Sequence, residues 1–224
     1  MRTVSMLATL AALLLVVSGC AHEHECGPSC CAHCCEYFQA PDREPEIGGM
    51  TAGQWAARAA TAEHENRQEI AVNLARFGPS ALCYAREFMA STDDTGARYL
   101  GCEVVRLIGP GGQDAIPDLA RLCGDHEPSI RGAAARALGA QERHYAQAGV
   151  AALGPLIDDE VWSVRYHAAE SLGAAGYEGH GWVGRLEHRS HHDSDIRVRR
   201  ACANAVVSIT TDWMVHRRLT HAGN

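Results

Sequence analysis

A short segment near the start of the chain concentrates side chains that bind metal ions. Residues 22–35 contain five cysteines and three histidines. Cys26 and Cys30 are separated by three residues, and Cys31 and Cys34 by two, spacings that let two side chains face one ion. Thiolate and imidazole ligands favour zinc or cuprous copper. The segment therefore predicts a candidate zinc or copper site formed by His22, His24, Cys26, Cys30, Cys31, His33, Cys34 and Cys35.

Two other interpretations of this segment remain open. Its adjacent pairs, Cys30-Cys31 and Cys34-Cys35, match no standard four-ligand zinc module. In an exported protein the same cysteines could form disulfides, and because their number is odd, one would stay free or pair between molecules. The segment could also be an unstructured tether.

The residues before this segment predict export and a lipid anchor. Arg2 precedes an apolar run from Leu7 to Val17, which is too short to span a bilayer, and Val17-Ser18-Gly19-Cys20 follows. This pattern resembles a bacterial lipoprotein signal peptide with its lipobox. The resemblance implies that Cys20 carries lipid, which excludes it as a metal ligand, and that the chain is anchored to a membrane facing the periplasm or the exterior.

Composition narrows the fold and the partner. About 205 residues follow the signal peptide, enough for one domain or one repeat array. The 20 basic residues, all arginine, are outnumbered by 27 acidic ones, which gives a net charge of −7. We therefore expect no nucleic-acid partner, because the phosphate backbone would be repelled. Abundant alanine and scarce aromatic residues favour closely packed helices.

After a proline- and glycine-bearing linker at 39–49, the chain repeats itself. Residues 129–139 and 163–173 are the clearest copies. Small or apolar residues recur three, four, seven and ten or eleven positions after a repeated arginine, which marks one apolar stripe on a helix, and a following glycine marks the stop. The repeated arginines are Arg67, Arg98, Arg131, Arg165 and Arg199.

A second apolar pattern and an acidic turn precede each of these helices, as in residues 115–128 and 150–160. Aspartate is a good N-cap, and Pro128 suits the first turn of a helix. A helix, an acidic turn and a helix opening on Val-Arg or Ile-Arg resembles HEAT repeats of the short kind found in phycobilin-lyase-like proteins. The resemblance covers residues 62–210 and implies an all-α, right-handed α-solenoid of about five helical hairpins.

The arginines and the acidic turns recur in step, which predicts a ladder of ion pairs. Arginine can bind a carboxylate with two parallel hydrogen bonds, and the carboxylate could belong to its own turn or to the adjacent one. The candidate acids are Asp94, Asp125, Asp159 and Asp193. The alternative is that the arginines form a stripe that binds anions.

Other reactive residues fall within the repeats. Cys83, Cys102, Cys123 and Cys202 lie in apolar helical patterns, where cysteine acts as a small buried hydrophobe. We expect Cys102 and Cys202 to be too far apart for a disulfide. A second candidate metal site comprises His188, His191 and His192 beside Asp193 and Asp195, although an exposed polar loop would explain these residues equally well.

These features divide the sequence into a signal peptide (1–19), a lipidated tail and linker (20–50), a solenoid (51–210) and a C-terminal capping helix with its tail (211–224). The glycine-rich residues 177–188 suggest that the last repeat begins with a short or distorted helix.

The HEAT resemblance implies a groove that binds other proteins. We therefore expect a membrane-anchored scaffold or adaptor for protein–protein interactions in the cell envelope. We do not expect an enzyme, because the chain has no Ser/His/Asp order, phosphate-binding glycine loop or HExxH motif. The first alternative is an envelope lipoprotein that binds zinc or copper through its tail. A bilin lyase-like enzyme is a remoter alternative, because such enzymes act on cytoplasmic proteins.

Overall fold

The computed structural model of the chain describes residues 45–62, 64–141 and 146–221. The signal peptide, Cys20 and all eight candidate metal ligands of the tail lie outside these residues. The described part is helical apart from turns and one isolated antiparallel bridge between Ile47 and Met50.

Successive helices pair into five hairpins, as the sequence predicts. The first helix of each hairpin belongs to one layer (the A layer) and the second to another (the B layer). The pairs are α2 (Ala52–Ala59) with α3 (His64–Ala75), α4 (Leu82–Ala90) with α5 (Thr95–Ile108), α6 (Ile116–Leu122) with α7 (Pro128–Gly139), α8 (Ala146–Leu153) with α9 (Trp162–Ala175), and α10 (Val183–His192) with α11 (Ile196–His221).

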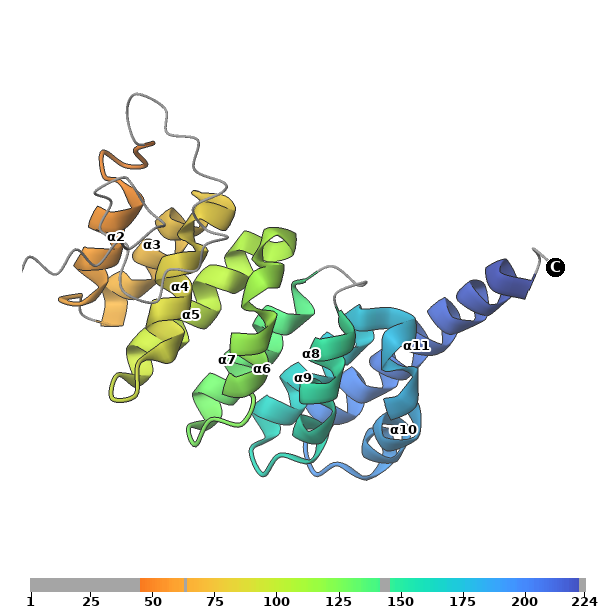
Figure 1. Cartoon of the computed structure of the whole chain (residues 1–224). Coiled ribbons are helices and arrows are strands. Elements are labelled where there is room, and N and C mark those ends of the chain that lie inside the picture. The colour runs from red at the N-terminus through yellow and green to blue at the C-terminus, as the bar shows by residue number, and fades with distance from the viewer. Residues whose placement is uncertain (1–44, 63, 142–145, 222–224) are drawn as a thin grey trace, which may run out of the picture.

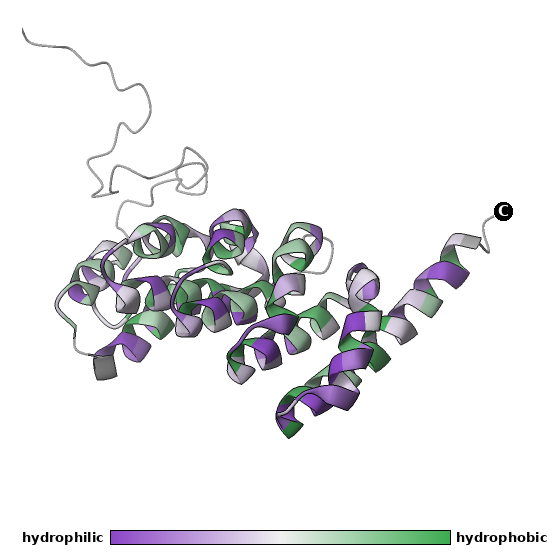
Figure 2. Cartoon of the chain, turned by 90° about the horizontal axis from the view of Figure 1, so that it is seen from below, coloured by the Kyte–Doolittle hydropathy of each residue, from purple (hydrophilic) through white to green (hydrophobic). Residues whose placement is uncertain are grey.

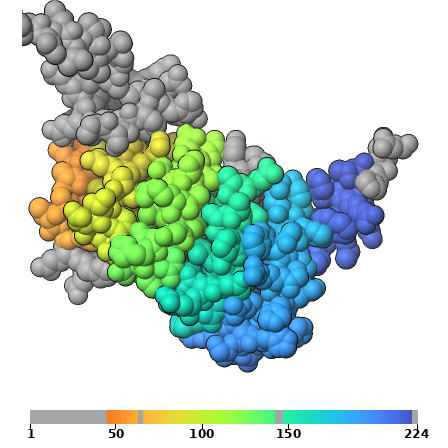
Figure 3. Space-filling model, turned by 60° about the horizontal axis from the view of Figure 1, so that its bottom comes forward, coloured from red at the N-terminus to blue at the C-terminus, as the bar shows by residue number. Residues whose placement is uncertain are grey.

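The hairpins stack in chain order to form an elongated α-solenoid (Figure 1). Each B-layer helix packs against the next, from α3 through α5, α7 and α9 to α11. The space-filling view shows the same order as successive bands of colour (Figure 3). The core therefore continues along the stack, and no hairpin could bury its apolar stripe without its neighbours.

Glycine ends three of the B-layer helices. Gly78, Gly109 and Gly176 follow α3, α5 and α9 with φ near +65°, a conformation that favours glycine. Gly173, which the sequence pattern places at a stop, instead lies inside α9. Its missing side chain lets α11 approach, because a Cβ there would lie 3.1 Å from the Cα of Ala205.

Short 3₁₀ helices lead into most A-layer helices or extend them: η1 (Gly78–Ala81), η2 (Gly109–Ala115), η4 (Gly154–Asp158) and η5 (Gly176–Trp182). Proline explains η4, because Pro155 has no N–H with which to continue α8. The apolar pattern at 150–157 is therefore divided between α8 and η4.

The solenoid begins with a well-defined cap. The Thr51 hydroxyl accepts a hydrogen bond from the Gln54 N–H, and the Gln54 side chain accepts one from the Thr51 N–H. The Trp55 indole N–H donates to the Ile47 carbonyl over 2.7 Å. The last residues of the predicted linker are thus folded onto α2.

The last hairpin differs from its expected form. Its first helix, α10, is a regular helix of ten residues and is longer than α6 and α8. Its second helix, α11, continues without a break to His221, so residues 211–221 extend the repeat helix where the sequence suggests a separate capping helix. No described helix is both long and apolar enough to cross a membrane.

Candidate functional site

Each acidic turn is organised by its aspartate. The carboxylates of Asp125, Asp159 and Asp193 each accept a hydrogen bond, 2.9 Å long, from the backbone N–H two residues later. The sequence suggests these aspartates as N-caps. The N-caps of α7 and α9 are instead Glu127 and Val161, two residues after Asp125 and Asp159. Only Asp94 caps its helix directly, through the Ala97 N–H.

Arg98, Arg131 and Arg165 each connect two turns. Arg165 donates to the carbonyls of Asp159 and Glu160 in its own turn and makes a bidentate pair with Asp193 of the next, at 2.8 and 2.9 Å. Arg131 pairs in the same way with Asp159, at 2.7 and 3.0 Å. The further pairs are Arg67 with Asp94 and Arg98 with Asp125. The ladder therefore runs from each of these four arginines to the following turn.

The ladder becomes more buried toward its C-terminal end. The Asp94 side chain is 49% exposed, whereas that of Asp193 is fully buried. Burial opposes ionisation of Asp193, but hydrogen bonds from Arg165 and from the Asp195 N–H outweigh it and lower the pKa of this carboxyl. Because their guanidinium groups are already paired, Arg67, Arg98, Arg131 and Arg165 join repeats and do not form the alternative anion-binding stripe.

Arg199 does not complete the series. It donates to the carbonyls of Asp193 and Ser194 in its own turn, as Arg98, Arg131 and Arg165 do in theirs. No carboxylate within the described part of the chain pairs with it.

A second polar cluster lies on the B layer, and no pattern in the sequence indicates it. The Glu103 carboxylate, on α5, is held by Arg106 at 2.9 Å and by Arg136 of α7. Arg136 also donates to the Tyr99 hydroxyl. The available signal was a glutamate between Cys102 and Val104, inside an apolar helical run.

The cluster continues on α9. The Tyr166 hydroxyl donates to the Glu170 carboxylate over 2.5 Å, and His167 Nδ1 lies 3.7 Å from the other carboxylate oxygen. Burial, together with the charge of Arg136, lowers the pKa of His167, so the neutral imidazole is favoured at pH 7. The Tyr166 hydroxyl, the His167 imidazole and the Glu170 carboxylate can form hydrogen bonds with a bound ligand and can transfer protons to or from it.

An open groove between α9 and α11 lies beside this cluster. Its floor is lined by small residues, namely Ala169, Gly173, Ala201 and Ala205. Its polar lining residues are Tyr166, Glu170, Arg197, Arg200, Asn204 and Ser208. The Arg197 guanidinium stacks 3.4 Å above the Trp162 ring and binds Asp195. A narrow segment of another protein fits a groove with a small, apolar lining and polar edges.

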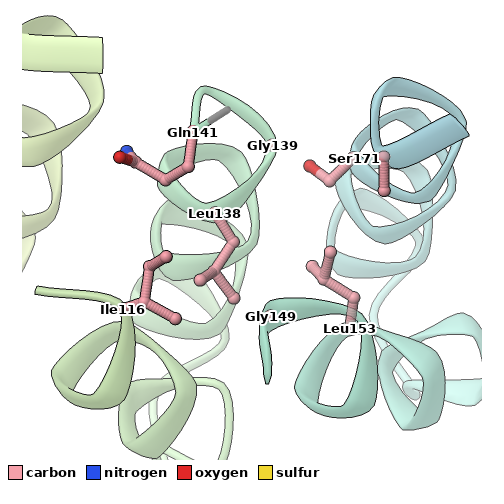
Figure 4. A pocket seen from close by; sticks show the side chains of 8 residues that line it. Ile116, Leu138, Gly139, Gln141, Gly149, Leu153 and Ser171 are labelled. Atoms are coloured by element: carbon pink, nitrogen blue, oxygen red, sulfur yellow. The ribbon is translucent and has the colours of Figure 1, made fainter. Parts of the chain in front are cut away.

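A smaller cavity lies among α6, α7, α8 and α9 (Figure 4). Ile116, Leu138 and Leu153 line it together with Gln141 and Ser171. Its volume of about 10 Å³ admits at most one water molecule, so this cavity is not a ligand site.

The histidine-rich end of α10 does not form the second predicted metal site. Asp193 is occupied by Arg165 and Arg189, and Asp195 binds Arg197. The His188 and His192 rings lie 4.7 Å apart. Among the described residues, no group of three or more His, Cys, Asp or Glu side chains is placed to hold a metal ion.

None of the four cysteines of the solenoid forms a disulfide within the described residues, and the Cys83 thiol donates to the Ser80 carbonyl. Cys102, Cys123 and Cys202 are buried and Cys83 is half-buried. Burial raises the pKa of Cys102 and of Cys123 to about 12 and that of Cys202 to about 11.

We expect these thiols to resist alkylation in the folded protein. At pH 8 iodoacetamide should label peptides that contain Cys102, Cys123 or Cys202 far more slowly than the same peptides in urea, because little thiolate forms. Peptide mass spectrometry measures the ratio. Equal labelling rates with and without urea would contradict the placement of these cysteines in the core.

Comparisons with known proteins agree with this architecture. Residues 127–207 match the sequence pattern of HEAT repeats. This part of the solenoid, from the start of α7 into α11, is a stack of HEAT repeats. No curated protein matches the chain.

Two solved structures resemble the HEAT-repeat solenoid. One is the complex of CpcE and CpcF of phycocyanin lyase from Nostoc sp. PCC7120. It matches with 21% identity and a TM-score of 0.59 over 69% of this chain and 96% of that one. The other is an engineered protein with 20% identity and a TM-score of 0.52, over 70% of this chain and 78% of that one. At these identities the likeness establishes the fold.

The expectation that the chain is not an enzyme is overturned by the first of these matches. That expectation depended on missing motifs and on the use of HEAT repeats for protein binding. The phycocyanin lyase structure has the same kind of solenoid, so the fold and the missing motifs do not exclude catalysis.

Proposed function

We propose that the HEAT-repeat solenoid is a membrane-anchored scaffold that binds a protein partner through the groove between α9 and α11. The groove carries this proposal, because small side chains line it and polar side chains from both helices flank it. Repeat solenoids commonly use such extended surfaces for binding. The matched solved structure is itself a complex of two chains, which supports an association role.

The anchor part of the proposal depends on Cys20. Replacing Cys20 with Ser removes the lipid attachment site of the lipobox, so we expect the variant to move from the membrane fraction to the soluble fraction. Immunoblotting of fractionated cells measures the distribution. Matched Cys26→Ser protein should stay on the membrane. Equal membrane association of the Cys20→Ser protein would overturn the lipid anchor.

The groove is tested by site-specific photo-cross-linking in the native host. A photoreactive residue at Asn204, in the groove, should give a discrete adduct, whereas one at Ala151, an exposed alanine on α8, should not. The Ala174→Arg change fills the groove and should abolish the adduct. An adduct pattern that is the same at both positions, or that survives Ala174→Arg, would overturn groove binding.

A lyase-like activity is the second candidate, favoured by the match to phycocyanin lyase. Tyr166, His167 and Glu170 would supply the proton-transfer groups beside the groove. The test is incubation of the purified chain with phycocyanin while the visible absorption of its chromophore is followed. A change that His167→Gln removes would favour a lyase. An unchanged spectrum with correctly folded protein would exclude phycocyanin as the substrate.

The tail remains a candidate zinc or copper site, independent of the groove. Metal analysis of protein released from membranes, with and without Ser at the five cysteines of residues 26–35, tests it directly. Loss of bound metal in the variant would support metal binding, and unchanged metal content would contradict it.

A further inference from the structure

We propose that the C-terminal end of the solenoid is an open repeat interface that binds a helical hairpin of another protein, whose acidic turn supplies a carboxylate to Arg199. This inference deepens the proposed scaffold role, but it concerns a surface different from the groove. The ladder rule provides the first argument. Arg98, Arg131 and Arg165 each donate to carbonyls of their own turn and bind the aspartate of the next turn, whereas Arg199 makes only the first set of contacts.

The face of α11 opposite α9 provides the second argument. Ala201, Ala205 and Ile209 are buried on the α9 side. On the opposite side Ile196, Val207 and Met214 are 55%, 65% and 55% exposed, at the spacing of one helical stripe. Every earlier B-layer helix is covered on this side by the next hairpin. The exposed stripe is thus the surface on which a sixth repeat would pack.

The shape of this end supports the same surface. A hollow between α10 and α11 is lined by Gly184, Glu187 and His188 on one side and by Ala203 and Val206 on the other. The C-terminal part of α11 projects beyond the other helices in two views, with apolar and polar residues alternating along it (Figures 1 and 2). A partner helix could lie in this hollow and extend along the projecting segment.

Charge indicates what kind of partner fits. Helix α11 contains five arginines and a single acidic residue, Asp212, in a chain with a net charge of −7. Two copies of α11 facing each other would therefore repel, whereas an acidic partner would be attracted.

The probe for this surface is a synthetic hairpin with the sequence of residues 183–206, the segment that gives Asp193 to Arg165 within the chain. Added terminal cysteines close it with a disulfide, Cys202→Ala removes the native thiol, and circular dichroism confirms that it is helical before use. Fluorescence anisotropy then measures its binding to the full chain.

We expect saturable binding that Arg199→Gln in the chain weakens at least tenfold. Asp193→Asn in the probe should cause the same loss, and the two changes together should cost little more than either alone. Val207→Asp should abolish binding, while Arg76→Gln, at an exposed arginine far from this end, should have no effect.

Three outcomes would overturn the proposal: no saturable binding of the helical probe, binding that is indifferent to Arg199 and Val207, or self-association of the chain through this face in analytical ultracentrifugation. The Ala174→Arg groove variant separates this inference from the proposed function. This variant should no longer form the photo-cross-linked adduct in the groove but should still bind the hairpin probe. Failure of the groove proposal can therefore be distinguished from failure of the Arg199 proposal.

Discussion

Asp193→Ala should be among the most destabilising single substitutions in the solenoid, with an expected loss of about 3–5 kcal/mol in the free energy of unfolding. The Asp193 side chain is fully buried and binds Arg165, Arg189 and the Asp195 N–H. Removing it leaves the Arg165 guanidinium, only 8% exposed, without its charge partner. Urea denaturation followed by circular dichroism measures the loss.

The matched control is Asp94→Ala at the exposed end of the same ladder. This aspartate is 49% exposed and its contacts with Arg67 are 3.4 and 3.5 Å long. We expect a loss of about 1–2 kcal/mol, mainly from the helix cap to the Ala97 N–H. Equal losses at the two ends would contradict the increase in burial along the ladder.

The ladder also predicts how stability changes with acidity. The pKa of Asp193 is lowered in the folded protein from its usual value of 3.8. Its stabilising contribution is therefore complete above pH 3.8 and is lost as the pH falls through the lower, folded value. Unfolding free energies of the wild type and Asp193→Asn should differ most near neutral pH and converge in acid. A constant difference would contradict this assignment.

Gly101→Ala should have the second large effect. A Cβ at this position of α5 would lie 2.6 Å from the Ala85 carbonyl oxygen and 3.0 Å from the Met89 backbone nitrogen. These are backbone atoms of α4, so the two helices of the hairpin must separate. We expect a loss of about 1–3 kcal/mol or more, although alanine normally favours a helix over glycine. Thermal denaturation measures it.

Gly184→Ala provides the control for helix propensity. Gly184 lies in α10, and a Cβ there meets nothing within 4 Å. The substitution should leave stability unchanged or raise it by up to about 1 kcal/mol. A similar loss at both positions would show that the close approach of α4 and α5 is not the cause.

The repeat pattern made the architecture predictable. Arginines 31 to 34 residues apart, each followed by an apolar stripe, place one B-layer helix per repeat, and the structure has five hairpins there. Pro128 also begins a helix where one was expected to start, and Gly78 and Gly109 follow B-layer helices where glycine stops were expected. Such features are local, and a single turn of backbone determines them.

Contacts between repeats were harder to predict from the sequence. The sequence could not decide which turn each arginine reaches, because own-turn carbonyls and next-turn carboxylates are equally compatible with the spacing. It also missed the group around Glu103, since Arg136 lies 33 residues away and meets it only after the helices stack. The sequence likewise did not indicate that Trp182, just before α10, packs where a Cβ on Gly154 would stand.

The most direct test of partner binding by the groove is an affinity measurement with the protein identified by cross-linking at Asn204. Biolayer interferometry would compare the wild-type chain with Ala174→Arg, which fills the groove, and Ala151→Arg, which adds the same side chain on α8. We predict at least a tenfold weaker affinity for Ala174→Arg, about 1.4 kcal/mol, and an unchanged affinity for Ala151→Arg. Equal affinities for all three proteins would contradict the groove as the binding surface.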